Sequence, residues 1–333
     1  CDRLILHPNV VNASDINELP DNALYVEGSI ITRLLMGTIG LQATRTNRVL
    51  VMLDDHPDTH FVDAAINSVS AARATYGLEC PEVVCLKPPI RMFAEYADSG
   101  RAVGRVENLE HCLHVLDETA GTYDAVALSS VIRVPREYHL DYFRSEGDMV
   151  NPWGGVEAML THAISSLLDV PTAHSPMFES RTVETLESGI VEPRMSAEAV
   201  SLSFLQCILK GLKKSPRIIR DETLFARPDV FSVEDVSCLV IPEGCLGLPT
   251  MAALEQGIPV IAVRENRNLM RNDLSQLPWQ KGQFIHVDNY LEAVGVMSAL
   301  KAGVTLESVR RPISATQVRK AIEERDQFAA GAE

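Results

Sequence analysis

The sequence predicts an α/β fold in which strands and helices alternate in layers around a mostly parallel, Rossmann-like sheet. Residues 48–54 (RVLVMLD) form a continuous apolar run, typical of a strand buried on both faces. Residues 59–75 then carry apolar side chains at helical spacing, and Gly77 follows as a helix terminator. Residues 82–86 (EVVCL) are the next apolar run. Strands separated by helices pair in parallel, because the crossover brings the chain back to the same edge of the sheet.

The same alternation continues along the chain. Residues 107–118 are amphipathic and precede Gly121, and residues 123–130 (YDAVALSS) resemble another buried strand. Further predicted strands are 3–6, 170–174, 216–220, 237–242, 258–263 and 283–287. Further predicted helices are 154–169, 196–212 with Ser196 as N-cap, 249–256 before Gly257, and 290–303 after the cap pair Asn289 and Glu292. Ser314 and Gln317 form a capping-box pattern that predicts one last helix.

We expect residues 1–333 to form one α/β unit, with possible lobes at 1–135 and 150–333. The segments 130–153 and 175–195 are the least regular and are rich in Pro, Glu, Arg and Ser. Such segments connect lobes or cover a site as long loops.

The composition limits the possible partners and the compartment. The formal net charge of −15 repels a phosphate backbone, which argues against nucleic-acid binding. No apolar run approaches the roughly 18 residues of a membrane span. The seven cysteines lack C-x-x-C spacing and lie in apolar stretches, so we expect reduced thiols in a cytoplasmic protein. The chain opens directly on an apolar run without Met, so we expect that it starts inside a longer protein.

Ligands of open parallel sheets bind beyond the carboxyl ends of the strands, and this rule selects most of the candidate site residues. Asn12, Glu27, Gly28 and Ser29 are added because they belong to motifs of a family resemblance that is described below. The candidates for acid–base catalysis are His7, Glu27, His56 and Glu265. The candidates for ligand binding are Asn9, Asn12, Gly28, Ser29, Ser129, Gly244, Cys245, Gly247, Arg264 and Asn266. We expect residues 7–12, 25–29 and 264–268 to line one pocket.

Two of these segments allow more than one interpretation. Residues 54–60 (DDHPDTH) could hold a metal or perform acid–base chemistry, but Asp58 or Thr59 as a plain helix cap is favoured. Residues 242–268 run from a strand through a glycine-containing turn into a helix N-terminus. This arrangement is equally consistent with an anion-binding site and with an ordinary connection between a strand and a helix. Cys245 in that turn could be an activated thiol, although most single cysteines are not. His111, His114 and His162 are interpreted as ordinary helix histidines, and no metal ligand is predicted.

The chain resembles a bacterial family of unknown function, DUF3326. The resemblance lies in His7-Pro8-Asn9-Val10 with Asn12, in residues 22–28 (NALYVEG), in residues 261–266 (IAVREN) and in residues 289–293 (NYLEA). A Gly-rich segment precedes the first motif in that family and is absent here. The resemblance implies that these segments are important as a group, and it implies no activity, cofactor or residue role.

The first functional hypothesis is an enzyme that acts on a small polar or anionic metabolite, by transfer or hydrolysis rather than by hydride transfer, since no dinucleotide fingerprint occurs. The alternative is a non-catalytic protein that binds such a ligand. A structural or oligomerising role is the third possibility. The sequence specifies no cofactor, and a homo-oligomer is possible.

Overall fold

The computed structural model describes residues 1–7, 19–80, 82–145, 149–186, 188–268 and 270–320, and it confirms the mixed α/β class. Its main sheet contains the parallel strands β5 (Val83–Leu86), β4 (Val49–Asp54), β8 (Ala125–Arg133) and β9 (Thr172–Met177), in that order. The end of β8 also pairs with β6 (Arg91–Tyr96), which forms an antiparallel hairpin with β7 (Ala102–Glu107). The main sheet therefore combines residues from both halves of the chain.

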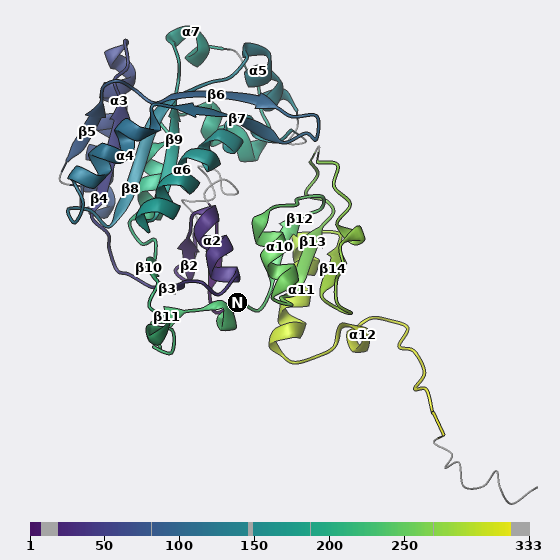
Figure 1. Ribbon diagram of the computed structural model, residues 1–333. Helices are drawn as coiled ribbons and strands as arrows, with labels where there is room; N and C mark the ends of the chain where they lie inside the picture. The colour runs from purple at the N-terminus through teal and green to yellow at the C-terminus, as the bar shows by residue number, and fades with distance from the viewer. Residues whose placement is uncertain (8–18, 81, 146–148, 187, 269, 321–333) are drawn as a thin grey trace, which may run out of the picture.

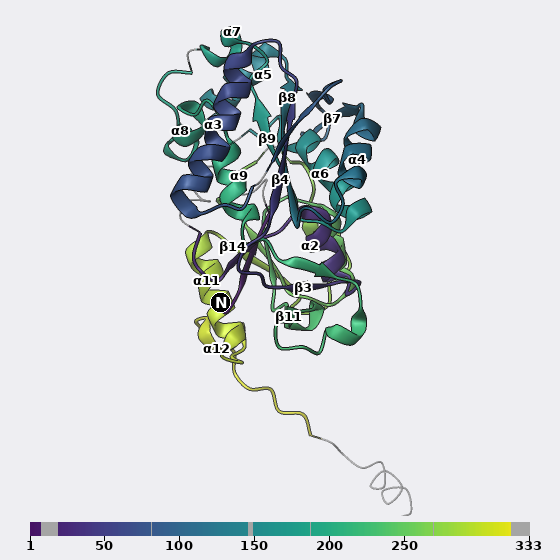
Figure 2. The ribbon, with the colours of Figure 1, turned by 90° about the vertical axis from the view of Figure 1, so that its left-hand side faces the viewer.

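Helices cover both faces of the main sheet, as Figure 2 shows. The helices α3 (Thr59–Tyr76) and α9 (Leu205–Leu212) pack on one face against Val51 and Leu53. The helices α4 (Leu109–Glu118) and α6 (Gly154–Leu168) pack on the other face against Leu50 and Met52. Successive side chains of a strand point to opposite faces, so a strand covered on both sides must be apolar throughout. This explains the uninterrupted apolar run in β4.

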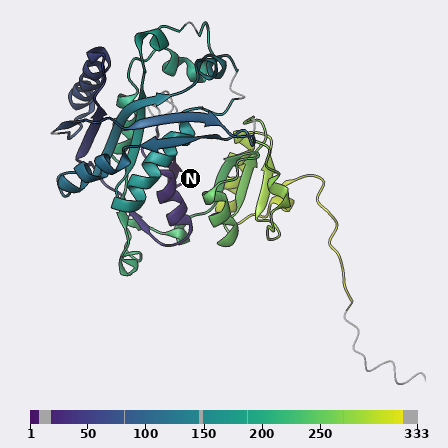
Figure 3. The same ribbon diagram turned by 45° about the horizontal axis from the view of Figure 1, so that its top comes forward.

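Three smaller sheets lie on one side of the main one, below it in the view of Figure 1 and again in Figure 3. The strands β1 (Leu4–Leu6) and β2 (Ala23–Tyr25) are parallel, whereas β3 (Gly40–Gln42) pairs antiparallel with β10 (Arg217–Ile219) and β11 (Val230–Phe231). The parallel strands β12 (Leu239–Pro242), β13 (Val260–Val263) and β14 (Phe284–Val287) form a separate sheet with α10 (Leu248–Glu255) and α11 (Tyr290–Lys301).

The remaining helices are short. The α-helices are α2 (Gly28–Leu35), α5 (Arg136–Arg144), α7 (Arg181–Glu184), α8 (Ser196–Ala199) and α12 (Leu306–Val309). The 3₁₀ turns are Pro193–Met195, Glu222–Leu224, Val233–Asp235 and Leu274–Gln276. Among the described residues, no helix combines the length and apolar character that crossing a membrane requires.

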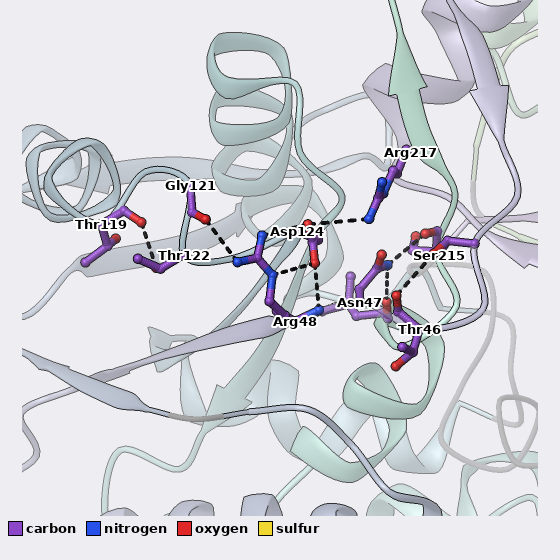
Figure 4. Close-up of polar contacts among 11 residues, drawn as sticks. Thr46, Asn47, Arg48, Thr119, Gly121, Thr122, Asp124, Ser215 and Arg217 are labelled. Carbon is purple, nitrogen blue, oxygen red and sulfur yellow. Dashed lines mark hydrogen bonds and ion pairs between the residues drawn. The ribbon is translucent and has the colours of Figure 1, made fainter.

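Polar contacts join the start of the main sheet to the chain that follows α9 (Figure 4). Arg48, before β4, donates to the Asp124 carboxylate before β8 at 2.9 and 3.0 Å. The buried Asn47 amide donates to the carbonyls of Leu212 and Ser215, at 2.8 Å each. The Asn47 bonds satisfy backbone carbonyls at the end of α9 and just after it, where no helical partner remains, and the Arg48–Asp124 pair joins the starts of two neighbouring strands.

Two helix predictions were wrong. The predicted helix 196–212 is divided into α8 and α9, because the Ser201 hydroxyl donates to the carbonyl of Ala197 and competes with the helix pattern. Residues 314–320 are not helical despite the capping pattern. Residues 310–320 are exposed, and a local cap without packing does not stabilise a helix. The hairpin β6–β7 was not predicted, because its strands are only partly apolar.

Asp54, at the carboxyl end of β4, is a buried acid whose protonation affects stability. Its side chain is 2% exposed, and one oxygen accepts from the Ile90 backbone N–H at 2.9 Å. The backbone of Val131 also forms a hydrogen bond with the carboxyl, but burial outweighs both bonds. Burial raises the pKa of Asp54 to about 7. The unfolded carboxyl has a pKa of about 3.9. The folded protein therefore retains a proton that the unfolded chain releases, and this contribution to stability is lost as the pH rises from about 4 to 7.

We expect Asp54→Asn to reduce this loss, so that its free energy of unfolding falls less between pH 4 and 7 than that of the wild type. At pH 8 the free energy of unfolding of Asp54→Asn would exceed that of the wild type by at most about 4 kcal/mol. Urea unfolding at pH 5 and pH 8 measures it. Asp55→Asn is the control, since Asp55 is exposed and pairs with Lys87 at 2.8 Å. Equal pH slopes for the wild type and Asp54→Asn would contradict the prediction.

Candidate functional site

A pocket of about 570 Å³ lies at the carboxyl ends of β8 and β9. Side chains from β2, β8, β9, α5, α6 and α9 line it. Its aromatic members are Tyr25, Tyr142, Phe143, Trp153, Phe178 and Phe204. Its charged or polar members include Arg136, His139, Asn151, Glu157, His174 and Asn266. A concave site that combines an aromatic wall with polar and charged groups is typical of small-molecule sites.

The start of α6 carries polar groups into this pocket. The side-chain oxygen of Asn151 accepts from the backbone N–H groups of Trp153 and Gly154, at 2.9 and 3.1 Å, and thereby begins the helix. Gly155 lies directly against β7, where a Cβ atom would approach the carbonyl oxygen of Ala102 to 2.0 Å. Only glycine allows this contact, and the contact holds α6, with Glu157 two residues further on, close to the sheet.

Glu157, His174 and Ser130 form a hydrogen-bonded chain. His174 Nδ1 lies 3.0 Å from Glu157 Oε1, and His174 Nε2 lies 2.7 Å from the Ser130 hydroxyl. The carboxylate can only accept, so Nδ1 carries the proton, and Nε2 then accepts from the serine. The same order of acid, imidazole and hydroxyl activates serine nucleophiles in hydrolases.

We call this hydrogen-bonded chain of Glu157, His174 and Ser130 the relay, and its three members are buried to different degrees. Ser130 is 1% exposed, His174 7% and Glu157 9%. His174 and Glu157 line the pocket, whereas the Ser130 hydroxyl lies behind the imidazole, on the strand next to His174. Tyr25 lies near Glu157, and burial together with this negative charge raises the pKa of the phenol well above its usual value.

The charges around the pocket leave one cation available. Glu179 pairs with Arg133 at 3.1 Å, and Glu192 pairs with Arg194 at 2.9 Å. Arg136 is exposed at the pocket and has no ion pair or hydrogen bond with any residue that the structure describes. A free guanidinium there can bind a carboxylate or phosphate in a bidentate manner.

A second cluster lies where β1 and β2 end beside α6. His7 follows β1 and Glu27 is the N-cap of α2, while the register of β1 and β2 pairs Leu6 with Tyr25. His162 of α6 completes the cluster, and one ligand atom from each residue lies within 4.8 Å of the other two. Two imidazoles and a carboxylate at this separation are a set that could hold a metal ion.

The Glu27 carboxylate is oriented by α2. One oxygen accepts from the Ser29 backbone N–H at 2.8 Å and from the Ser29 hydroxyl. The other lies 2.9 Å from His162 Nε2. Burial alone would raise the pKa of Glu27, but these contacts with His162 and Ser29 outweigh it and lower the pKa. Burial lowers the pKa of His7 to about 4, so its imidazole is neutral at pH 7.

The structure brings some of the predicted residues together. His7, Glu27, Gly28 and Ser29 meet in the second cluster, and Asn266 lies at the pocket together with Tyr25. Asn9 and Asn12 lie outside the described residues. The Asn266 amide donates to the Tyr290 hydroxyl at 2.5 Å.

Other predicted residues lie apart from both groups. His56 packs on Phe61, and its Nδ1 accepts from the Asp58 N–H at 3.0 Å, so residues 54–60 mainly cap α3. Ser129 is buried in β8. Glu265 is exposed on the loop after β13.

In the turn before α10, Gly244 has a left-handed φ of 79° and Gly247 is the helix N-cap. Burial raises the pKa of Cys245, which does not suit an activated thiol. Arg264 is engaged with Asp288 and His286, at 3.0 Å each.

The residues that sequence reasoning missed are His162, Ser130, His174 and Glu157. His162 resembled an ordinary helix histidine, and Glu157 is an acidic residue in the first turn of a helix, where such residues are common. Ser130 and His174 are the last residues of the predicted strands 123–130 and 170–174, at the edge that selected the other candidates, and this was an available signal, because buried polar groups need partners.

The fold and these two clusters define an α/β protein with a large pocket at the carboxyl edge of its main sheet. A family described as "Protein of unknown function (DUF3326)" matches residues 1–310. An uncharacterized lipoprotein of Synechococcus sp. (strain ATCC 27144 / PCC 6301 / SAUG 1402/1) is 31% identical over 307 residues, which cover 91% of this chain and 82% of that protein. This chain therefore belongs to the DUF3326 family, as the resemblance implied. No solved structure matches it.

The pocket wall at Tyr25 depends on a glycine in α9. A Cβ atom on Gly211 would approach the Tyr25 ring to 2.4 Å. We expect Gly211→Ala to displace the ring and to destabilise the protein by about 1–3 kcal/mol, since tightly packed cores tolerate added volume poorly. Chemical unfolding measures the change.

Gly295→Ala is the matched control, because Gly295 is also a helix glycine but nothing lies within 4 Å of its Cβ position. This variant should gain up to about 1 kcal/mol from helix propensity. A neutral Gly211→Ala would show that the Tyr25 ring is free to move.

Proposed function

We propose that this protein is an enzyme that acts on a small polar or anionic metabolite, by hydrolysis or group transfer, in the pocket at the carboxyl edge of the main sheet. The observation that carries the proposal is the relay of Glu157, His174 and Ser130, at 3.0 and 2.7 Å. Two of its members line a pocket of about 570 Å³, a size suited to a metabolite.

The relay suits nucleophilic catalysis. Glu157 holds the proton on His174 Nδ1, so that Nε2 can take the Ser130 proton while the serine oxygen bonds to an electrophilic carbon of the substrate. The imidazolium then returns the proton to the leaving group, and water or a second substrate releases the acyl group by the reverse steps. The charge on Glu157 stabilises the imidazolium in between.

The substrate class follows from the remaining pocket groups. Arg136 offers an unpaired guanidinium to a carboxylate or phosphate, and the aromatic side chains accommodate an apolar portion. Ser130 lies behind His174 in the described conformation, so the substrate reaches the hydroxyl only when the pocket wall moves.

A fluorophosphonate reagent, which modifies activated serine hydroxyls, tests the relay. We expect one adduct on the wild-type protein, detected by intact mass, and none on Ser130→Ala. His174→Gln should slow labelling by at least about 100-fold, the scale of general-base assistance. Ser165→Ala is the control: its hydroxyl is also buried, but it lies on α6 and donates to the Val170 carbonyl at 2.9 Å, away from any histidine hydrogen bond. An equal amount of adduct on Ser130→Ala would show that Ser130 is not the nucleophile.

The second candidate is a non-catalytic protein that binds a small ligand. The 1% exposure of Ser130 favours it, because a hydrogen-bonded hydroxyl in a buried strand can simply satisfy His174. An unlabelled wild-type protein whose melting temperature rises with a carboxylated or phosphorylated metabolite, with the shift lost in Arg136→Ala, would support this candidate.

We also propose the cytoplasm as the compartment. The cysteines of the structure are free thiols, which fits a reducing environment. The Synechococcus relative is named a lipoprotein, which points to a membrane anchor for that protein. Fractionation of cells that express the full-length protein tests the compartment, and recovery with the membranes would contradict our proposal.

A further inference from the structure

Three segments that lie far apart in sequence place metal-ligating side chains at one point, beside the pocket. They are the residue after β1, the N-cap of α2 and the middle of α6. We propose that His7, Glu27 and His162 form a binding site for a divalent transition-metal ion of the zinc class. The inference does not depend on the proposed function, because none of the three residues belongs to the relay. It departs from our sequence-based expectation of no metal ligand.

The separation of the three groups suits a metal ion. Their ligand atoms all lie within 4.8 Å of one another. Zinc binds histidine nitrogens and carboxylate oxygens at about 2.0–2.2 Å, so ligand atoms at the corners of a tetrahedron are roughly 3.4 Å apart. Small side-chain movements therefore bring all three groups to coordination distance. Two histidines and a glutamate leave a fourth position open, as in catalytic zinc sites.

Gly28 keeps the space between the two imidazoles open. A Cβ atom there would approach His7 Nε2 to 2.4 Å and His162 Nε2 to 2.8 Å. Both nitrogens thus face the same small volume next to the glycine. The backbone of Gly28 is helical, in the first turn of α2, so the glycine is needed for space rather than for conformation.

The carboxylate is positioned in advance. One oxygen of Glu27 is held by the N-terminus of α2, through the Ser29 backbone N–H at 2.8 Å. The other is the oxygen that lies 2.9 Å from His162 Nε2 and 3.4 Å from the Thr161 hydroxyl. Groups that orient a metal ligand in this way raise metal affinity.

The contact between His162 and Glu27 is short but is not a well-directed hydrogen bond. His162 Nε2 is a buried atom, and no described residue gives it a hydrogen bond of acceptable geometry, although Glu27 is only 2.9 Å away. A nitrogen and an oxygen that face a shared volume rather than each other are arranged as two ligands of one ion. A buried polar atom without a hydrogen bond otherwise costs stability.

Zinc titration of the full chain tests the site. The protein is stripped with a chelator and dialysed, and Zn²⁺ binding is followed by calorimetry, with bound metal counted by elemental analysis. We expect about one equivalent in the wild type. His162→Ala should weaken binding by more than about 100-fold, because loss of a direct ligand exceeds the effect of losing an outer-shell partner. His162 has a side chain that is 41% exposed, so this variant should fold.

Two further variants separate this site from adventitious binding. Gly28→Ala should also lose zinc, since its methyl group would occupy the space between the imidazoles, whereas His114→Ala should bind zinc as the wild type does. His114 is an exposed histidine that lies 3.3 Å from Glu118 on α4. Co²⁺ gives a second readout, as the visible absorption of a low-symmetry bound ion should appear in the wild type and vanish in His162→Ala.

The proposal is overturned if the wild type binds no zinc, or if both His162→Ala and Gly28→Ala retain the one equivalent with unchanged affinity. Retention would place the ion at other histidines. Serine labelling by the fluorophosphonate reads the relay separately, so failure of the metal site and failure of the proposed enzyme are distinguishable.

Discussion

The contact between Gly155 and the backbone of β7 is the constraint on which both polar clusters depend. A Cβ atom at this position would lie 2.0 Å from the carbonyl oxygen of Ala102, so α6 can approach the sheet this closely only with glycine here. The approach brings Glu157 to His174, and it brings His162, five residues later, to Glu27. A wider spacing between α6 and the sheet would separate both pairs.

The parallel strands supply the other half of each cluster. His174 lies in the middle of β9 and Ser130 in the second half of the neighbouring strand β8, and His7 and Glu27 follow the ends of the parallel pair β1 and β2. Parallel pairing aligns the ends of strands that are far apart in sequence. One helix lying across two such ends can therefore complete two separate sites.

The two clusters differ in the way their polar groups are satisfied. In the relay, each ring nitrogen of His174 forms a hydrogen bond, one with Glu157 and one with Ser130, so the hydrogen bonds are continuous from the carboxylate to the hydroxyl. In the second cluster, the nitrogen of His162 lies near a carboxylate without a directed hydrogen bond. A continuous chain of hydrogen bonds can transfer protons, whereas lone pairs that converge on one point can bind a cation. The same residue types thus support different chemistry in the two places.

The sequence by itself determined the alternation of strands and helices, because a strand covered on both faces is apolar at successive positions, as Val49–Leu53 of β4 are. It also indicated His7, which directly follows the predicted strand 3–6, whereas the family resemblance indicated Glu27 and Gly28. It could not indicate Glu157 and His162, because a single acid or histidine on a helix looks the same whether it meets a partner or solvent. Only the tertiary structure decided which strand ends α6 crosses, because that crossing depends on contacts between residues far apart in the sequence, such as Gly155 with Ala102 and His162 with Glu27.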